Sequence, residues 1–128
     1  MSRPAAPMRS KRGAQARLAG RRGEILAALW LMIKGYRILG LRLGTPQAEI
    51  DILAEKGDLV VVVEVKSRTT SQEALEAVRP EQQRRLLRAA EAILAQRRGM
   101  ADRPIRLDLI ALAPGRAPRH IRGAWLGT

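Results

Sequence analysis

The chain contains no cysteine and no phenylalanine, and its aromatic residues are limited to two tryptophans and one tyrosine among 128 residues. Without cysteine, neither a disulfide nor a thiolate metal site can hold the fold together, and this absence fits a reducing compartment. A single domain of this length buries roughly two-thirds of its unfolded surface. The sequence therefore predicts one packed hydrophobic core.

Long hydrophobic runs are also missing. The longest uncharged apolar run spans residues 25–33, which is too short to cross a bilayer. The first residues carry arginines but lack the apolar core of a secretory signal ahead of a small-residue cleavage site. The sequence therefore predicts a soluble cytoplasmic protein that does not act at membranes.

Acidic residues are scarce, because 12 Asp and Glu stand against 24 Lys and Arg, for a formal net charge of +12. A charge of this size favours binding to polyanions, of which nucleic acid is the commonest. All but four of the basic residues are arginine, and in a chain also rich in alanine that bias can equally reflect a GC-rich coding sequence. Charge alone therefore favours nucleic acid without establishing it.

Lysine is rare as well, and one of the four lysines lies inside an apolar run. Residues 59–63 read Leu-Val-Val-Val-Val and predict a strand buried on both faces, yet Glu64 and Lys66 follow directly. An ammonium is a compact charge with a tunable pKa, whereas a guanidinium stays protonated. Burying an unpaired charge costs on the order of several kcal/mol, so these two charges predict an ion pair, a metal or a functional site.

Two regions are predicted, a disordered basic arm at residues 1–13 and a single domain at residues 14–128. The arm carries two prolines and four basic residues, with no acid and little to bury. A helix follows, with its firm part at residues 21–34, and Gly35 closes it. Its apolar residues recur at helical spacing: Ile25, Leu29, Met32 and Ile33.

Segments of strand character separated by turn residues predict strands at residues 36–43, 49–54, 59–67 and 105–113, with an edge strand compatible with residues 120–126. A capping box at residues 70–73 opens a short helix, and Pro80 opens a longer one. The first three strands can pair antiparallel through short turns, whereas a helical crossover makes the third and fourth parallel. The fold class is therefore α/β, an αβββαβ chain with a mixed central sheet flanked by helices.

Asp51 is expected to lie on the same face as Glu64 and Lys66. A four-residue turn over 56–59 places Asp51 directly opposite Glu64, whereas a two-residue turn at 56–57 shifts the pairing by two residues. Both registers bring the three charges onto one face, and a slip by a single residue separates them.

Clustered carboxylates repel each other unless they share a cation, and oxygen ligands without nitrogen or sulfur donors suit Mg²⁺ or Mn²⁺. Such an ion can bind a phosphate oxygen and lower the pKa of a bound water. A nearby lysine can orient or deprotonate that water, or neutralise charge in the transition state. The cluster therefore has the groups needed for metal-assisted phosphodiester hydrolysis.

The pattern D…E-x-K on the second and third strands resembles the PD-(D/E)XK nuclease superfamily. The chain is more closely similar to the YraN-like family of predicted endonucleases, which resemble archaeal Holliday-junction resolvases. The resemblance covers residues 20–126 and rests on segments in the family's order, which are Gly23-Glu24, Gly35-Tyr36, Ala48-Glu49-Ile50-Asp51, Val63-Glu64-Val65-Lys66 with Arg68, and Arg106-Leu107-Asp108. It implies a restriction-endonuclease-like fold.

By that resemblance, Asp51 and Glu64 are the metal ligands and Lys66 is the catalytic lysine. Glu24 is a supporting carboxylate brought in from the first helix. Two departures weaken the match, because Ala48 replaces the family's usual glycine and a glutamine replaces a lysine that is frequent at the start of the long helix. Weaker contacts with nucleic acid are expected from Arg68, Arg21, Arg22, Gln82 and Arg85.

Structural alternatives stay open for the charged residues. A lone E-x-K is usually an ordinary ion pair at the exposed end of a strand. Glu24 is expected in the first turn of a helix, where the dipole favours any acid. Glu49 is expected to pair with Arg42 or Arg68 rather than to join a metal site. Arg68 could clamp a phosphate or satisfy a carboxylate.

Two further polar residues are assigned structural roles. Asp108 lies in the fourth strand beside Arg106 and is expected to form a structural ion pair with it. His120 is the only histidine, and it is expected to be a surface residue of the last strand rather than a general base.

The sequence thus predicts an Mg²⁺- or Mn²⁺-dependent endonuclease acting on DNA. The alternatives are a non-catalytic nucleic-acid-binding module of the same fold and a basic protein-interaction subunit with an ion-paired cluster. The scarcity of aromatic residues disfavours base stacking on single strands and favours recognition of the backbone of duplex or junction DNA. A homodimer would suit a symmetric junction, but no segment of the sequence demonstrates one.

Overall fold

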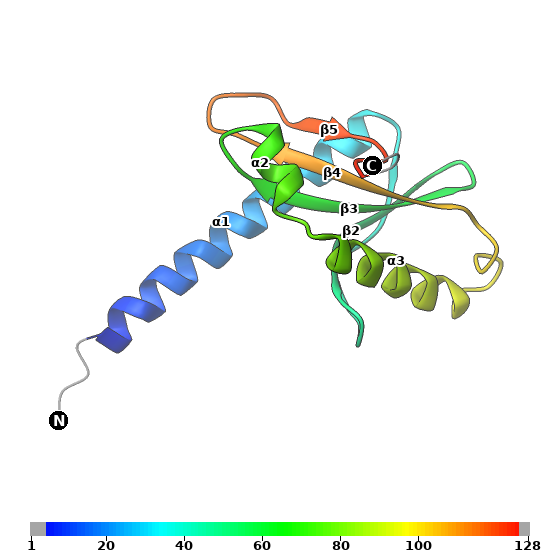
Figure 1. Ribbon diagram of the computed structural model, residues 1–128, viewed down its shortest axis with the longest axis horizontal. Coiled ribbons are helices and arrows are strands. Elements are labelled where there is room, and N and C mark those ends of the chain that lie inside the picture. The colour runs from blue at the N-terminus through cyan, green and yellow to red at the C-terminus, as the bar shows by residue number, and fades with distance from the viewer. Residues whose placement is uncertain (1–4, 126–128) are drawn as a thin grey trace.

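The computed structural model describes residues 5–125, with side chains from residue 17 onward. The described part of the chain forms one five-stranded sheet in sequential strand order, in which β3 and β4 run parallel and the other pairs antiparallel. The α/β prediction of a mixed sheet flanked by helices is confirmed (Figure 1). The elements are α1 (Ala5–Ile33), β1 (Arg37–Gly44), β2 (Glu49–Lys56), β3 (Leu59–Ser67), α2 (Ser71–Glu76), α3 (Pro80–Ala95), β4 (Ile105–Leu112) and β5 (Arg119–Ile121).

The strand β3 lies at the centre of the core. Its valines, residues 60–63, are fully buried and alternate between two clusters. Val60 and Val62 pack with α3, whereas Val61 and Val63 pack with α1. Because helices cover both faces, this strand can be a continuous apolar run, as parallel strands usually are.

The first helix begins earlier than the sequence predicted. It starts at Ala5, so most of the expected disordered arm at 1–13 is helical, and residues 1–4 lie outside the described residues. Pro7 falls in the first turn, where proline is tolerated, and good helix formers such as alanine, arginine and glutamine predominate after it. Between residues 5 and 125, no helix is long and apolar enough to cross a membrane.

The buried face of α1 consists of two alanines and one leucine, and most of the large apolar residues of the helix lie outside it. Ala27, Ala28 and Leu31 are buried against the sheet. All four apolar residues of the helical pattern are exposed, and Ile33 reaches 80% exposure. Two alanines allow the helix axis to approach the valines of β3 closely, so the pleated surface selects this face over the bulkier one.

The β2–β3 ladder stops before either strand ends. It runs from Lys56↔Leu59 to Ile52↔Val63, after which β3 keeps pairing with β4 as far as Ser67↔Leu112. The beginning of β2 instead pairs with β1. The sheet therefore forks between β2 and β3, and Figure 1 shows the β1–β2 turn diverging from the end of β3.

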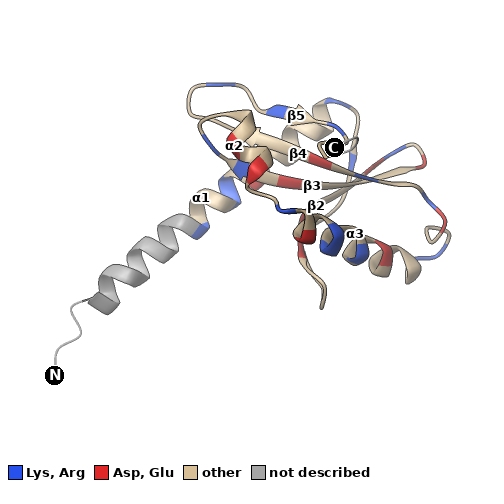
Figure 2. Ribbon diagram, in the orientation of Figure 1, with Lys and Arg blue, Asp and Glu red and all other residues tan. Residues whose placement is uncertain are grey.

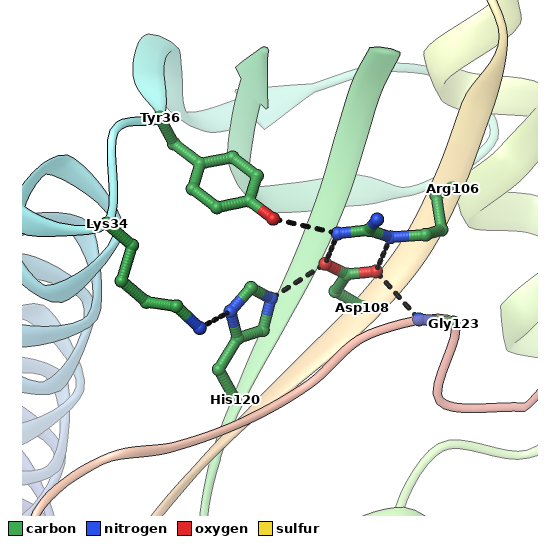
Figure 3. A network of polar contacts seen from close by, with 6 residues as sticks. All are labelled: Lys34, Tyr36, Arg106, Asp108, His120 and Gly123. Carbon is green, nitrogen blue, oxygen red and sulfur yellow. Dashed lines mark hydrogen bonds and ion pairs between the residues drawn. The ribbon is translucent and has the colours of Figure 1, made fainter. Parts of the chain in front are cut away.

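A buried polar network joins α1 to the last two strands (Figure 3). Asp108 on β4 is fully buried and accepts two hydrogen bonds of 2.7 Å from Arg106, by Nε and Nη2. The backbone N–H of Gly123 donates to the same carboxylate at 2.9 Å. Arg106 also donates to the hydroxyl of Tyr36, just after α1, at 2.9 Å. The expected Asp108–Arg106 pair is confirmed.

His120 is a member of this network, and the prediction of a surface residue is wrong. Its side chain is 1% exposed, and Nε2 lies 2.7 Å from Asp108 Oδ2. Nδ1 lies 2.6 Å from Nζ of Lys34 at the end of α1. Burial alone would raise the pKa of Asp108, but the hydrogen bonds from Arg106, His120 and Gly123 hold it below its usual value.

We expect Asp108→Asn to lower the free energy of unfolding by about 3–5 kcal/mol at pH 7, because one partner of a buried ion pair is removed. The pKa of Asp108 is lowered by folding. The stability that ionised Asp108 gives the wild type is therefore fully present above its unfolded pKa of about 3.9. This stability is lost as the pH falls through the lower pKa of the folded state. Denaturant unfolding at neutral and acid pH measures both effects.

The matched control is Asp58→Asn, which changes an exposed acid in the β2–β3 turn. We expect it to alter stability by less than about 0.5 kcal/mol. A loss below about 1 kcal/mol for Asp108→Asn at neutral pH would contradict a stabilising role for the network.

Candidate active site

Asp51 lies where the β2–β3 ladder ends. Its Oδ2 accepts a hydrogen bond of 2.9 Å from the backbone N–H of Val65 on β3. Ile50 packs into the cluster beneath α3 and Ile52 into the cluster beneath α1, so the alternation of β2 breaks at Asp51. The carboxylate thus takes the place of a ladder partner and points toward β3.

Glu64 is the buried carboxylate of the site. It is 2% exposed, and its Oε1 has no hydrogen-bond partner. Burial, followed by the charges of Asp51 and Glu24, raises the pKa of Glu64 to about 8, against the opposing charge of Lys66. A buried acceptor without a protein partner is rare, and a proton, a cation or an ordered water can supply the missing contact.

Asp51 belongs to the same electrostatic group. Burial raises its pKa, as do the charges of Glu24 and Glu49, whereas the hydrogen bond from Val65 and the charge of Lys66 lower it. Two neighbouring acids with raised pKa values repel each other when both are ionised. Such a pair is a characteristic feature of functional sites.

Lys66 supplies a positive charge beside the two acids. It is half-buried and follows Glu64 by two residues on β3, so both side chains lie on one face of the strand. The ladder pairs Lys56 with Leu59, which is the register that continues to Asp51 opposite Glu64. The structure therefore brings together the three charges that the sequence placed on one face.

Glu24 approaches the cluster from α1, where the helix packs closely on the sheet. A Cβ on Gly23 would lie 3.1 Å from the Leu112 side chain, which shows how tightly α1 meets β4 at this point. Glu24 is about one-seventh exposed and accepts a hydrogen bond of 2.5 Å from Arg42 Nε. It lies far inside α1 rather than in a first turn, so the explanation by the helix dipole is wrong.

Arg42 is the counter-ion that the sequence did not assign correctly. It lies opposite Asp51 in the β1–β2 ladder, with a left-handed φ of 51° that is uncommon for a long side chain. Its hydrogen bond with Glu24, followed by the charges of Glu24, Glu49 and Asp51, raises its pKa against an opposing effect of burial. The expected ion pair of Arg42 with exposed Glu49 is replaced by one with Glu24.

The donor set fits a hard divalent cation. The available ligands are carboxylate oxygens, and Glu64 Oε1 is a buried acceptor without a partner. Across the residues with described side chains, no group of three or more His, Cys, Asp or Glu side chains is placed to hold a metal. Mg²⁺ is commonly bound by one or two carboxylates together with waters and substrate phosphates, so the pair of Asp51 and Glu64 matches the usual number of protein ligands.

The residues predicted to make weaker contacts with nucleic acid lie in three parts of the chain. Arg21 and Arg22 are exposed on the turn of α1 before Glu24. Arg68 is exposed, and its guanidinium donates to the Ser67 carbonyl at 2.8 Å. Gln82 and Arg85 lie on α3, where Arg85 forms an ion pair with Glu81. In the described part of the chain, no hydrogen bond or ion pair joins these residues to Asp51 or Glu64.

Comparison with known proteins gives one consistent result. A model of the family described as "Uncharacterised protein family UPF0102" matches residues 23–112. A UPF0102 protein of Caulobacter vibrioides is 59% identical over 123 residues, which cover 96% of this chain and 98% of the relative. One from Caulobacter sp. strain K31 is 63% identical over 91% and 84%, and one from Paramagnetospirillum magneticum is 47% identical over 94% and 95%.

Glu64→Gln is expected to change how stability depends on pH. The folded pKa of Glu64 is about 8, and the unfolded value is about 4.3. Between these values the folded state holds a proton that the unfolded state lacks, so wild-type stability falls as the pH rises from 5 to 8. The variant has no such proton, and in chelator its Tm should exceed that of the wild type by about 5 °C or more at pH 8.

Metal should reverse this loss of stability in proteins that keep Glu64 and should not do so in Glu64→Gln. Because Mn²⁺ competes with the proton, the rise in Tm that it causes should be larger at pH 8 than at pH 6. Glu91→Gln, an exposed acid on α3, is the control and should follow the wild type. Equal pH profiles for Glu64→Gln and the wild type would show that the carboxyl is not held protonated.

Proposed function

The chain belongs to the UPF0102 family, and from the geometry of its carboxylate site we propose that it is a metal-dependent endonuclease that hydrolyses phosphodiester bonds in DNA. This membership also confirms the resemblance to the YraN-like family. The observation that carries the proposal is the buried Glu64, whose Oε1 has no partner, beside Asp51 and Lys66 at the fork of the sheet. In an ordinary structural ion pair, a buried carboxylate oxygen is usually bonded to its partner.

Asp51 and Glu64 are the residues that would hold Mg²⁺ or Mn²⁺. A bound ion of this kind supplies positive charge to the phosphodiester and makes water more acidic. The hydrogen bond from Val65 fixes one oxygen of Asp51, at 2.9 Å, and leaves the other for a ligand. Burial excludes bulk water from Glu64, which strengthens every electrostatic interaction at the site.

Lys66 is proposed to orient the attacking water and to stabilise the charge of the transition state. Hydrolysis joins the water oxygen to phosphorus, breaks one bridging P–O bond and delivers a proton to the leaving oxygen. An ammonium next to the carboxylates can orient the water and stabilise the negative charge that develops on the phosphoryl oxygens. Glu24, held by Arg42 at 2.5 Å, supports the site from α1.

DNA is proposed as the substrate on the basis of charge and composition. The net charge of +12 favours a polyanion. With only three aromatic residues in the chain, base stacking on unpaired strands is poorly provided for, so duplex or branched DNA recognised by its backbone is the proposed form. The cytoplasm is the proposed compartment.

A non-catalytic nucleic-acid-binding module is the second candidate. One observation favours it, namely that Arg42 already neutralises the Glu24 carboxylate, which leaves the cluster with fewer free ligands. This candidate predicts binding that does not depend on metal and no cleavage.

The test is cleavage of end-labelled single-stranded, duplex, flap and four-way-junction DNA with Mg²⁺ or Mn²⁺. We expect Asp51→Ala to abolish cutting and Lys66→Ala to reduce its rate by about 10²-fold or more. Lys66→Arg keeps a positive charge but not a compact ammonium and should also be impaired. Asp58→Ala, in the turn of the same hairpin, is the control and should cut like the wild type.

If the wild type and the variants bind DNA equally and none cuts it, the binding module becomes the better account. Cutting that persists unchanged in both Asp51→Ala and Lys66→Ala would place the activity elsewhere or in a contaminant.

A further inference from the structure

A basic hollow of about 620 Å³ lies beyond the C-terminal ends of β3 and β4. Its charged lining residues are Arg68, Arg116 and Arg119, and no acidic residue lines it. The hydroxyl-bearing residues Thr69 and Ser71 contribute polar groups to its wall. The hollow therefore combines a concave shape with charge of a single sign.

One row of paired residues in the sheet connects Lys66 of the carboxylate site to the lining of the hollow. Lys66 pairs with Ala111 on β4, and Ala111 pairs with Arg119 on β5. Residues directly opposite each other on neighbouring strands share a face, and the strands lie about 4.8 Å apart. The small side chain of Ala111 thus lies between two long cations, and it lines the hollow.

The other two arginines flank this row. Arg68 follows Lys66 by two residues on the same face, and its backbone N–H donates to the Leu112 carbonyl at 3.0 Å. Arg116 lies in the β4–β5 connection, directly after Gly115, whose φ of 72° forms the turn. Figure 2 shows basic residues in that connection and on β5. The backbone in these two places thus brings Arg68 and Arg116 to the lining of the hollow.

These three guanidinium groups are exposed and not committed to carboxylates. Among the described residues, none of the ion pairs includes Arg68, Arg116 or Arg119. Other exposed arginines, such as Arg88 and Arg98, are likewise outside these ion pairs, whereas Arg42, Arg103 and Arg106 are paired. What distinguishes Arg68, Arg116 and Arg119 is that they line one hollow with no acidic lining residue, so together they offer a local site for an anion.

We propose that this hollow binds the phosphodiester backbone of the DNA strand that adjoins the scissile phosphate. The inference rests on the proposed function, which supplies the identity of the polyanion. Guanidinium groups match phosphate oxygens in two-point hydrogen bonds. If one phosphate of the DNA strand lies next to Lys66, the phosphates that follow it would reach Arg119 and Arg116 on the other side of Ala111. The hollow would thereby fix the direction in which the strand crosses the site.

The experiment measures binding without cleavage. The affinity of a labelled four-way junction and of a labelled duplex is followed by fluorescence anisotropy in EDTA, from roughly 50 to 200 mM salt. For Arg116→Ala/Arg119→Ala we expect at least tenfold weaker binding at the middle of this range. The slope of log K against log salt should fall by about 1.8, if each arginine neutralises one phosphate. Arg116→Lys/Arg119→Lys should retain most of the slope.

The control variant loses the same amount of positive charge at a site away from the hollow. Arg88→Ala/Arg98→Ala removes two exposed arginines on and just after α3 and should weaken binding by less than about threefold. All variants should melt within a few degrees of the wild type, because the changed side chains are exposed.

Each possible result supports or overturns the hollow as a binding site for DNA. Equal weakening by the Arg116/Arg119 and Arg88/Arg98 variants would reduce the effect to net charge and overturn the hollow as a site. Wild-type affinity in the Arg116/Arg119 variant would overturn the hollow alone, with the nuclease proposal intact. Selective weakening in a protein that never cuts would support the hollow and reject the nuclease. Absence of DNA binding by the wild type would overturn both.

Discussion

Burial of β3 on both faces is the constraint on which the rest of the molecule depends. Residues 60–63 can be fully buried only if α1 covers one face of the strand, α3 covers the other and β4 pairs along it. The same burial extends to Glu64, the next residue, and makes its charge costly. Beyond Val63 the sheet forks, and there a side chain, Asp51, replaces the backbone partner of Val65. The charge of Asp51 adds to the cost of ionising Glu64, and the charge of Lys66 opposes it.

The parts of the fold that the sequence predicted well depend on local pattern. The strand at residues 59–67 has the predicted bounds, because its apolar run begins right after a turn and ends in polar residues. Of the two registers that the sequence left open for the β2–β3 hairpin, the structure has the one that continues to Asp51 opposite Glu64, with Gly57 in the turn at a positive φ of 61°. The Asp108–Arg106 pair joins residues two apart on one strand, so alternation alone places them together.

The parts that it missed depend on contacts between distant segments. Residues 25–33 are apolar all round the helix, so no periodicity reveals that Ala27 and Ala28 face the sheet. His120 contacts Asp108, 12 residues away, and Lys34, 86 residues away. The Glu24–Arg42 pair requires α1 to meet the sheet closely at Gly23. Only a three-dimensional arrangement carries this information, and the local signal that could have drawn attention to Arg42 was its strand position opposite Asp51.

The edges of the sheet have a consequence for association between chains. A valine-rich sheet with a long, flat edge invites strands of other molecules to pair with its free N–H and C=O groups. Here β5 has only three residues. At the opposite edge, β1 has an irregularity between Ile38 and Gly40 and the left-handed backbone of Arg42. The residue that balances Glu24 therefore also distorts an edge that would otherwise offer a template for aggregation.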